Sequence, residues 1–138
     1  MLNRGRGAGE GVACGESEQL NFLEAIEAHV RWKIRLEAYI AGTSEEQLNA
    51  EVICKDDQCV LGKWIYGPGG VKYGELHKFV DLKDTHTHFH TSAGNVVRLV
   101  DGGDVDGARE LLCKGEYAKL SHRIKAKLAR LSLQLDED

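Results

Sequence analysis

The sequence predicts an all-α protein, an antiparallel four-helix bundle with one short extra helix. Apolar residues recur every three or four positions over four long stretches of the chain. Glycines and the single proline, Pro68, separate these stretches, and no segment alternates apolar and polar residues with the period of two that marks a strand. Because 138 residues can bury a core without disulfides, one helical domain is expected.

The start of the chain differs in composition from the rest. Residues 1–16 are rich in glycine and have no apolar periodicity, so they are predicted to form a disordered tail, with the domain over residues 17–138. Gly5, Gly7 and Gly9 do not predict a phosphate-binding loop, because no strand precedes them and no lysine follows at the required offset.

The first predicted helix follows a cap at Ser17 and ends at Gly42. Its apolar residues lie at helical spacing and predict a broad buried stripe. The stripe is expected to contain Phe22, Ile26, Val30, Ile34, Leu36 and Ile40.

A shorter second helix is expected to open at Thr43 or Ser44 and to continue through Ile53. Residues 55–70 are then broken by glycines and Pro68. Cys59 falls within this break.

A long third helix is predicted over residues 73–100, and the DGGD turn at residues 101–104 leads to the short extra helix over residues 105–113. After Gly115 the chain forms the last amphipathic helix. The buried seam of the long helix is expected to contain Leu76, Phe79, Lys83, His86, His90, Ala93, Val97 and Val100. That of the last helix is expected to contain Tyr117, Leu120, Ile124, Leu128, Leu131 and Leu135.

The aspartates of the DGGD turn do not predict a calcium site. The turn lacks the acidic spacing of a calcium loop, and no glutamate stands at the twelfth position counted from Asp101. It is expected to cap the helix that follows.

Charge and hydropathy exclude several function classes. A net charge of −4 gives no basic field for nucleic acid or an anionic membrane. No apolar run approaches the roughly 20 residues of a membrane span, and the start of the chain has no signal-peptide segment, so a cytoplasmic location is expected. In a reducing compartment no disulfides are expected among the cysteines, which are Cys14, Cys54, Cys59 and Cys113.

The histidines predict a metal site. His86 and His90 are four residues apart, so both imidazoles lie on one helix face and can bind one ion, whereas His88 points to the other side. Two unpartnered imidazoles in an apolar seam would be costly to bury. His29 lies on the inward stripe of the first helix, and with Cys59 the set offers three imidazoles and one thiolate, which suits tetrahedral zinc.

Three segments carry a resemblance to a known family. AHVRWK around His29, CVLGKWIYG from Cys59 and HTHFH from His86 resemble the bacterial chemoreceptor zinc-binding (CZB) domain, over roughly residues 20–133. The resemblance implies a helical bundle, a homodimer and zinc ligands at His29, Cys59, His86 and His90. Next to the thiolate, we expect Gly62 to allow a tight approach and Trp64 to close the bundle over the metal.

Domains of this family act as sensory or regulatory modules, commonly in chemoreceptors or diguanylate cyclases. The resemblance therefore implies that zinc occupancy or oxidation of Cys59 changes a signalling output, such as chemotaxis or cyclic-di-GMP synthesis. The chain itself departs from the usual architecture, because it has no coiled-coil signalling hairpin and no cyclase domain. The output is expected to lie in a partner protein, unless the chain is free-standing or a piece of a longer protein.

Other readings of the zinc site stay open or are disfavoured. A structural zinc domain that serves only dimerisation or docking is consistent with a closed site. A zinc hydrolase would need an open coordination position and a general base, and the chain has no HExxH motif, so no enzyme activity is expected. A di-iron carrier would need paired Glu-x-x-His motifs, which are absent.

Cys54 is expected to be a small buried residue, with a role as resolving thiol for oxidised Cys59 as the alternative.

Overall fold

The computed structural model describes residues 20–137. Over this range the chain forms seven α-helices and no strand, which confirms the predicted all-α helical bundle. The helices are α2 (Phe22–Ala41), α3 (Ala50–Ile53), α4 (Val60–Ile65), α5 (Pro68–Tyr73), α6 (His77–Asp101), α7 (Val105–Cys113) and α8 (Glu116–Glu137). The residues of the predicted tail, 1–16, and the predicted cap Ser17 lie outside the described range.

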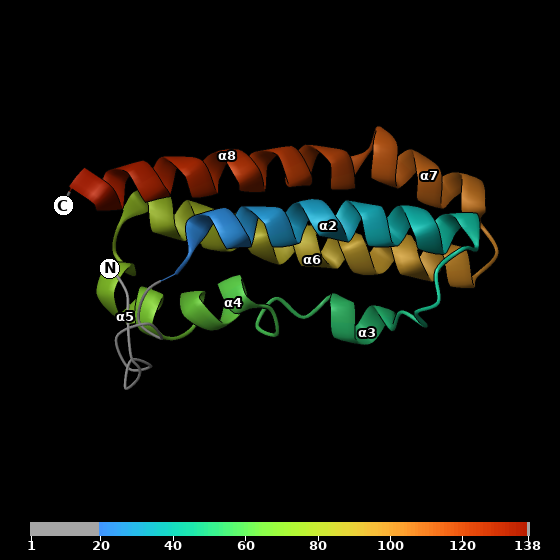
Figure 1. Ribbon diagram of the computed structural model, residues 1–138, viewed down its shortest axis with the longest axis horizontal. Coiled ribbons are helices and arrows are strands. Elements are labelled where there is room, and N and C mark those ends of the chain that lie inside the picture. The colour runs from blue at the N-terminus through green and yellow to red at the C-terminus, as the bar shows by residue number, and fades with distance from the viewer. Residues whose placement is uncertain (1–19, 138) are drawn as a thin grey trace.

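The three long helices α2, α6 and α8 lie side by side along the long axis of the molecule (Figure 1). Helix α6 contacts α2, α3, α7 and α8, so it is the central element of the bundle. The short helices α3, α4 and α5 follow one another along the remaining side, as one broken pass of the chain (Figure 1). The Cys59 segment lies within this broken pass, beside α6.

Side-chain and backbone caps determine where α2 begins and ends. Asn21 caps the first turn, because its side chain accepts a hydrogen bond from the Glu24 backbone N–H at 3.0 Å. Gly42 ends the helix with φ of 76°, in the left-handed region that glycine tolerates best. The predicted end at Gly42 is therefore confirmed.

The second predicted helix begins later than the sequence pattern indicated. Ser44 accepts a hydrogen bond from the Glu46 backbone N–H at 3.0 Å and forms a local turn instead of a helix cap. Helix α3 starts at Ala50, where the side chain of Asn49 caps the first turn. The prediction of a start at Thr43 or Ser44 is wrong. Ser44 forms its hydrogen bond within a local turn, and Asn49 provides the cap from which the helix starts.

Two of the predicted buried stripes differ from the observed ones. On α2, Val30 and Ile34 are 41% and 61% exposed, Ala25 is buried instead, and His29 is buried as predicted. On α6, Lys83 is exposed and Leu82 is buried. A count of large apolar residues misses inward positions that are filled by small or polar side chains.

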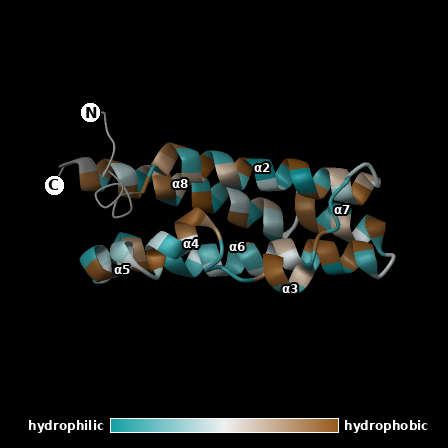
Figure 2. Ribbon diagram, turned by 60° about the horizontal axis from the view of Figure 1, so that its bottom comes forward, coloured by the Kyte–Doolittle hydropathy of each residue, from teal (hydrophilic) through white to brown (hydrophobic). Residues whose placement is uncertain are grey.

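The core runs the length of the bundle. Tyr117, Ile124, Leu128 and Leu131 of α8 are fully buried, as the periodicity of this helix predicted. Figure 2 shows hydrophobic and hydrophilic residues alternating around the long helices, as expected for helices with one buried face. No helix in residues 20–137 combines the length and apolar character that a membrane span requires.

Candidate metal centre

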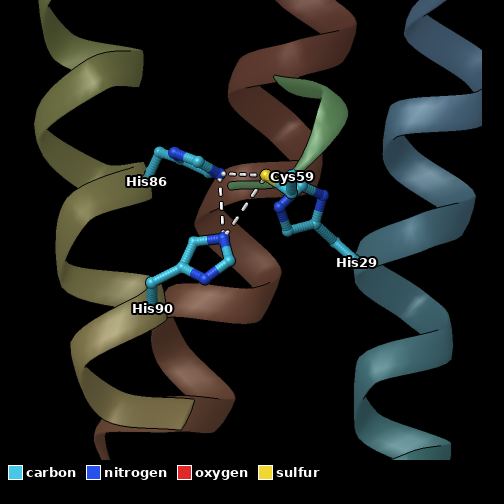
Figure 3. Close-up of side chains that lie close together, drawn as sticks. All are labelled: His29, Cys59, His86 and His90. Atoms are coloured by element: carbon cyan, nitrogen blue, oxygen red, sulfur yellow. Dashed lines mark hydrogen bonds between the residues drawn. The ribbon is translucent and has the colours of Figure 1, made fainter. Parts of the chain in front are cut away.

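Four side chains from separate parts of the chain meet between α2, α4 and α6 (Figure 3). His29 comes from α2, Cys59 precedes α4, and His86 and His90 lie one turn apart on α6. Their donor atoms all lie within 4.8 Å of one another. Within the described part of the chain, this is the one group of three or more histidine, cysteine or acidic side chains arranged to hold a metal ion.

The distances between three of the donor atoms are close to the edges of a zinc tetrahedron. Cys59 Sγ lies 3.3 Å from His86 Nε2 and 3.6 Å from His90 Nε2, and the two Nε2 atoms are 3.1 Å apart. A tetrahedral ion with bonds of about 2.0–2.1 Å to nitrogen and 2.3 Å to sulfur requires donor separations of about 3.3–3.6 Å. The two distances from Cys59 lie in this range and the Nε2–Nε2 distance is slightly shorter, so a zinc ion would fit this face of the site after the two imidazoles move apart by a few tenths of an ångström.

Backbone carbonyls orient two of the imidazoles. His29 Nδ1 donates to the Ala25 carbonyl at 2.7 Å, and His90 Nδ1 donates to the Ile53 carbonyl at 2.9 Å. In a neutral imidazole the second nitrogen, Nε2, then carries a lone pair. His29 Nε2 is buried and has no hydrogen-bond partner among the described residues. This buried Nε2 atom directs a lone pair without a partner towards the cluster, and a metal ion would accept that lone pair.

Burial keeps the imidazoles neutral. It lowers the pKa of His29 to about 4, against an opposing effect of the hydrogen bond to Ala25. Burial, together with the neighbouring His90 and His29, lowers the pKa of His86 to about 2. Burial also lowers the pKa of His90. Neutral imidazoles are the form that binds metal, so the environment prepares all three as ligands.

Cys59 is held at the start of α4 by the helix itself. Its Sγ caps the first turn and accepts a hydrogen bond from the Gly62 backbone N–H at 3.3 Å. Burial nevertheless raises the pKa of the thiol, because a thiolate here has no counter-charge. A divalent cation at the cluster would supply that charge and deprotonate the thiol.

Gly62 is required by a close approach of the backbone. A Cβ atom at this position would lie 1.8 Å from the Asp56 carbonyl oxygen, a contact that no side chain can make. This observation supports the tight approach predicted at Gly62. The turn from Asp56 to Gly62 is thereby folded back on itself, with Cys59 at its centre.

Trp64 lies away from the metal cluster. Its ring packs edge-on against Phe22 and Phe79 and also contacts Tyr73. Phe22 and Phe79 each precede a cluster histidine by seven residues, which is about two helical turns. The expectation that Trp64 closes the bundle over the metal is wrong, because the orientation of α4 turns this ring towards α5.

A cleft of about 370 Å³ reaches the cluster from the surface. Cys59 and His90 line it, whereas His29 and His86 do not. One wall is formed by Trp32 with the Arg35 guanidinium 4.0 Å above its ring, and Arg35 pairs with Glu46 at 2.6 Å. Two of the four donors are therefore accessible from the cleft, and the other two face the core.

One charged residue beside the site was not identified from the sequence. Asp56 accepts hydrogen bonds from Tyr66 Oη and Thr87 Oγ1, both at 2.6 Å. Thr87 stands directly after His86, so Asp56 joins the Cys59 turn to the helix that carries two of the imidazoles. The sequence did contain one indication of this residue, the pair of aspartates between two cysteines in CKDDQC. No sequence rule predicts that one of these aspartates bonds Thr87, which lies on another helix.

The remaining cysteines and the acidic turn lie apart from the cluster. Cys54 is half-buried, and its Sγ contacts the Glu51 carbonyl at 3.3 Å. Cys113 is exposed, and the described cysteines are all free thiols. In the DGGD turn, Asp104 accepts a hydrogen bond from the Gly107 backbone N–H at 2.8 Å, as the expected helix cap.

Comparison with known protein families gives a match to the ligand-bearing part of the chain. The model of the chemoreceptor zinc-binding domain matches residues 29–97, which is half of the chain. No curated protein and no solved structure matches the chain significantly. The matched segment begins at His29 and continues beyond His90, so it contains every residue of the cluster. The protein belongs to the chemoreceptor zinc-binding domain family.

Proposed function

We propose that the protein is a sensory or regulatory domain that binds one zinc ion through His29, Cys59, His86 and His90. The observation that carries this proposal is the meeting of these four donors within 4.8 Å of one another, with His29 and His90 oriented by backbone carbonyls. Zinc occupancy, or oxidation of Cys59, would change the packing of α2, α4 and α6 around the ion. A signalling partner, such as a chemoreceptor or a diguanylate cyclase, would respond to that change.

Oxidation at Cys59 has a defined chemistry. A bound zinc ion would hold the Cys59 sulfur as a thiolate, the form that attacks oxidants. Hypochlorous acid takes two electrons from this sulfur, its hydroxyl group ends on the sulfur as a sulfenic acid, and chloride leaves. The sulfenic acid is a poor zinc ligand, so its formation would remove one of the four ligands and favour release of the ion.

We also propose that the domain forms a homodimer through the outer face of α2. Leu23 and Ile34 are 67% and 61% exposed on this face, and Val30 lies between them. Glu27 lies towards the N-terminal end and Arg31 towards the C-terminal end, so an antiparallel pair would place Glu27 opposite Arg31 of the partner subunit. Light scattering is expected to show a dimer that Ile34→Glu dissociates and that Val71→Glu, a change at a 90% exposed site on α5, leaves intact.

The zinc proposal is tested by measuring metal content on untagged protein, for the natural chain and Cys59→Ser, before and after a brief stoichiometric oxidant pulse. About one zinc per chain, lost in the variant and released by the pulse, is the expected result for a redox-responsive sensor. Zinc retained through the pulse would instead favour a structural zinc domain that serves dimerisation or docking. Protein without zinc would contradict the ligand assignment.

A further inference from the structure

We propose that Asp56 is a positioning residue for the metal centre, which holds the Cys59 turn against α6 through Thr87. The proposal concerns a residue outside the four donors, and it rests on the proposed zinc function. Asp56 precedes Cys59 by three residues and touches none of the imidazoles through a hydrogen bond. It acts through the position that it gives to the thiol.

The hydrogen bonds of Asp56 connect two elements. Thr87 Oγ1 donates to Asp56 Oδ2 at 2.6 Å, and Tyr66 Oη donates to the same oxygen at 2.6 Å. Tyr66 ends α4 and Thr87 lies on α6, immediately after His86. One carboxylate oxygen therefore joins the helix that Cys59 caps to the helix turn that carries His86 and His90.

The backbone of Asp56 contributes a second restraint. Its carbonyl oxygen lies against Gly62, so closely that a Cβ on Gly62 would approach it to 1.8 Å. Cys59 stands between these two contact points and also accepts a hydrogen bond from the Gly62 N–H. A displacement of Asp56 would therefore displace the sulfur.

The charge of Asp56 supports the same role. Burial acts to raise the pKa of this carboxyl group, but the hydroxyls of Thr87 and Tyr66, its own backbone N–H and the nearby His90 together lower the pKa, so the group stays ionised. A zinc ion with one thiolate and three neutral imidazoles would carry a net charge of +1, and the negative charge of Asp56, which acts on both His90 and Cys59, would offset it.

Two threonines of α6 provide a matched comparison. Thr87 Oγ1 also lies 3.1 Å from the Lys83 carbonyl, and Thr91 Oγ1 makes the equivalent contact with the Thr87 carbonyl at 3.1 Å. Thr91 has no hydrogen bond to a carboxylate among the described residues. Thr87→Val and Thr91→Val therefore make the same isosteric change on the same helix, and differ in the bond to Asp56.

The test is a cobalt titration of the metal-free natural protein, Thr87→Val, Thr91→Val and the rescue variant Thr87→Ser. The thiolate-to-cobalt absorption band reports ligation by Cys59 directly. A general loss of stability would not weaken this band in protein that remains folded. Thr87→Val is expected to weaken cobalt affinity by about 10–100-fold and to reduce this band, with Thr91→Val and Thr87→Ser close to the natural protein. Equal affinity and equal band intensity in the two valine variants would overturn the proposal.

A second measurement separates this proposal from the zinc assignment. In metal-free protein, the alkylation rate of Cys59, followed by peptide mass spectrometry, is expected to rise in Thr87→Val and not in Thr91→Val. Asp56→Asn, which keeps the shape and removes the charge, shows whether charge or hydrogen bonding dominates. If the natural protein binds no metal, the zinc proposal fails while the alkylation rates still test the position of Cys59; unchanged rates would contradict the role of Asp56.

Discussion

His86 Nε2 lies 3.1 Å from His90 Nε2, one helical turn away on α6. His90 uses its Nδ1 proton to bond the Ile53 carbonyl, so its Nε2 atom presents a lone pair to His86. In metal-free protein the pair is satisfied by one proton shared between the rings. A metal ion bound to both Nε2 atoms would displace that proton to His86 Nδ1, so both imidazoles would stay neutral and metal uptake would release no proton from this pair.

Removal of either imidazole should therefore abolish stoichiometric zinc binding. The natural protein is expected to contain about one zinc per chain. His86→Ala and His90→Ala are each expected to contain far less, because each variant lacks one of the four ligands. His88→Ala is the control, since His88 is exposed on the same helix and bonds only the Asp84 carbonyl and carboxylate. Zinc content by mass spectrometry checks this, and loss of zinc in the His88 variant would contradict it.

The metal-free domain should lose stability as the pH falls below about 6.5. The pKa of His29 is lowered to about 4 and that of His86 to about 2, from an ordinary value of 6.5. Above pH 6.5 the two imidazoles are neutral in the folded and in the unfolded chain. Below pH 6.5 they take up protons in the unfolded chain first, so the free energy of unfolding falls with the pH. Each imidazole contributes up to about 1.4 kcal/mol per pH unit to this fall in the free energy of unfolding.

Urea unfolding of metal-free protein between pH 7.0 and 5.0 measures this slope. His29→Gln is expected to reduce it, and the exposed His88→Gln to leave it unchanged. A free energy of unfolding that stays constant over this range would show that the imidazoles are not buried in the neutral form.

Gly62→Ala should disturb both the fold and the thiol. The added Cβ would meet the Asp56 carbonyl oxygen at 1.8 Å, so the turn must open, at a cost of about 1–3 kcal/mol. Gly102→Ala is the matched control, because its nearest contact would be 3.3 Å. Thermal unfolding and metal content measure the two effects; equal behaviour of the two alanine variants would contradict the close approach.

Tyr117→Phe should leave stability unchanged or raise it. Tyr117 is fully buried, and its hydroxyl has no hydrogen-bond partner among the described residues, so its removal relieves a desolvation cost of up to about 1 kcal/mol. Tyr66→Phe makes the same chemical change but removes the donor to Asp56. We expect the second variant to be the less stable in denaturant titrations, and the reverse order would refute the assignment of the two hydroxyls.

The cleft should control access to Cys59 and His90. Val52 lines it and is 50% exposed, so Val52→Trp fills the opening without entering the core. Val60 is 72% exposed beside Cys59 but does not line the cleft, which makes Val60→Trp the control. We expect Val52→Trp to slow zinc removal by a chelator and alkylation of metal-free Cys59 several-fold; equal rates in both variants would show that reagents enter elsewhere.

Short-range signals identified most of the helices. Gly42 ends α2 and Asp104 caps α7 as predicted, because a cap depends on residues a few positions apart. The start of α3 was misplaced, since Ser44 and Asn49 compete for the same role and their local preferences do not decide between them. The exposure of Val30 and Ile34 was also missed, because an apolar residue on α2 is buried only where another element covers it.

The sequence by itself determined the helical class and the candidate ligands. The spacing of His86 and His90 places two imidazoles on one face of any helix, whatever the rest of the chain does. Only the tertiary structure decided the distances from Cys59 to the imidazoles, the tautomer of His90, the displacement of Trp64 from the cluster and the bond from Thr87 to Asp56. Each of these joins atoms from elements far apart in the chain, and their separation is set by how the helices pack, which no local pattern encodes.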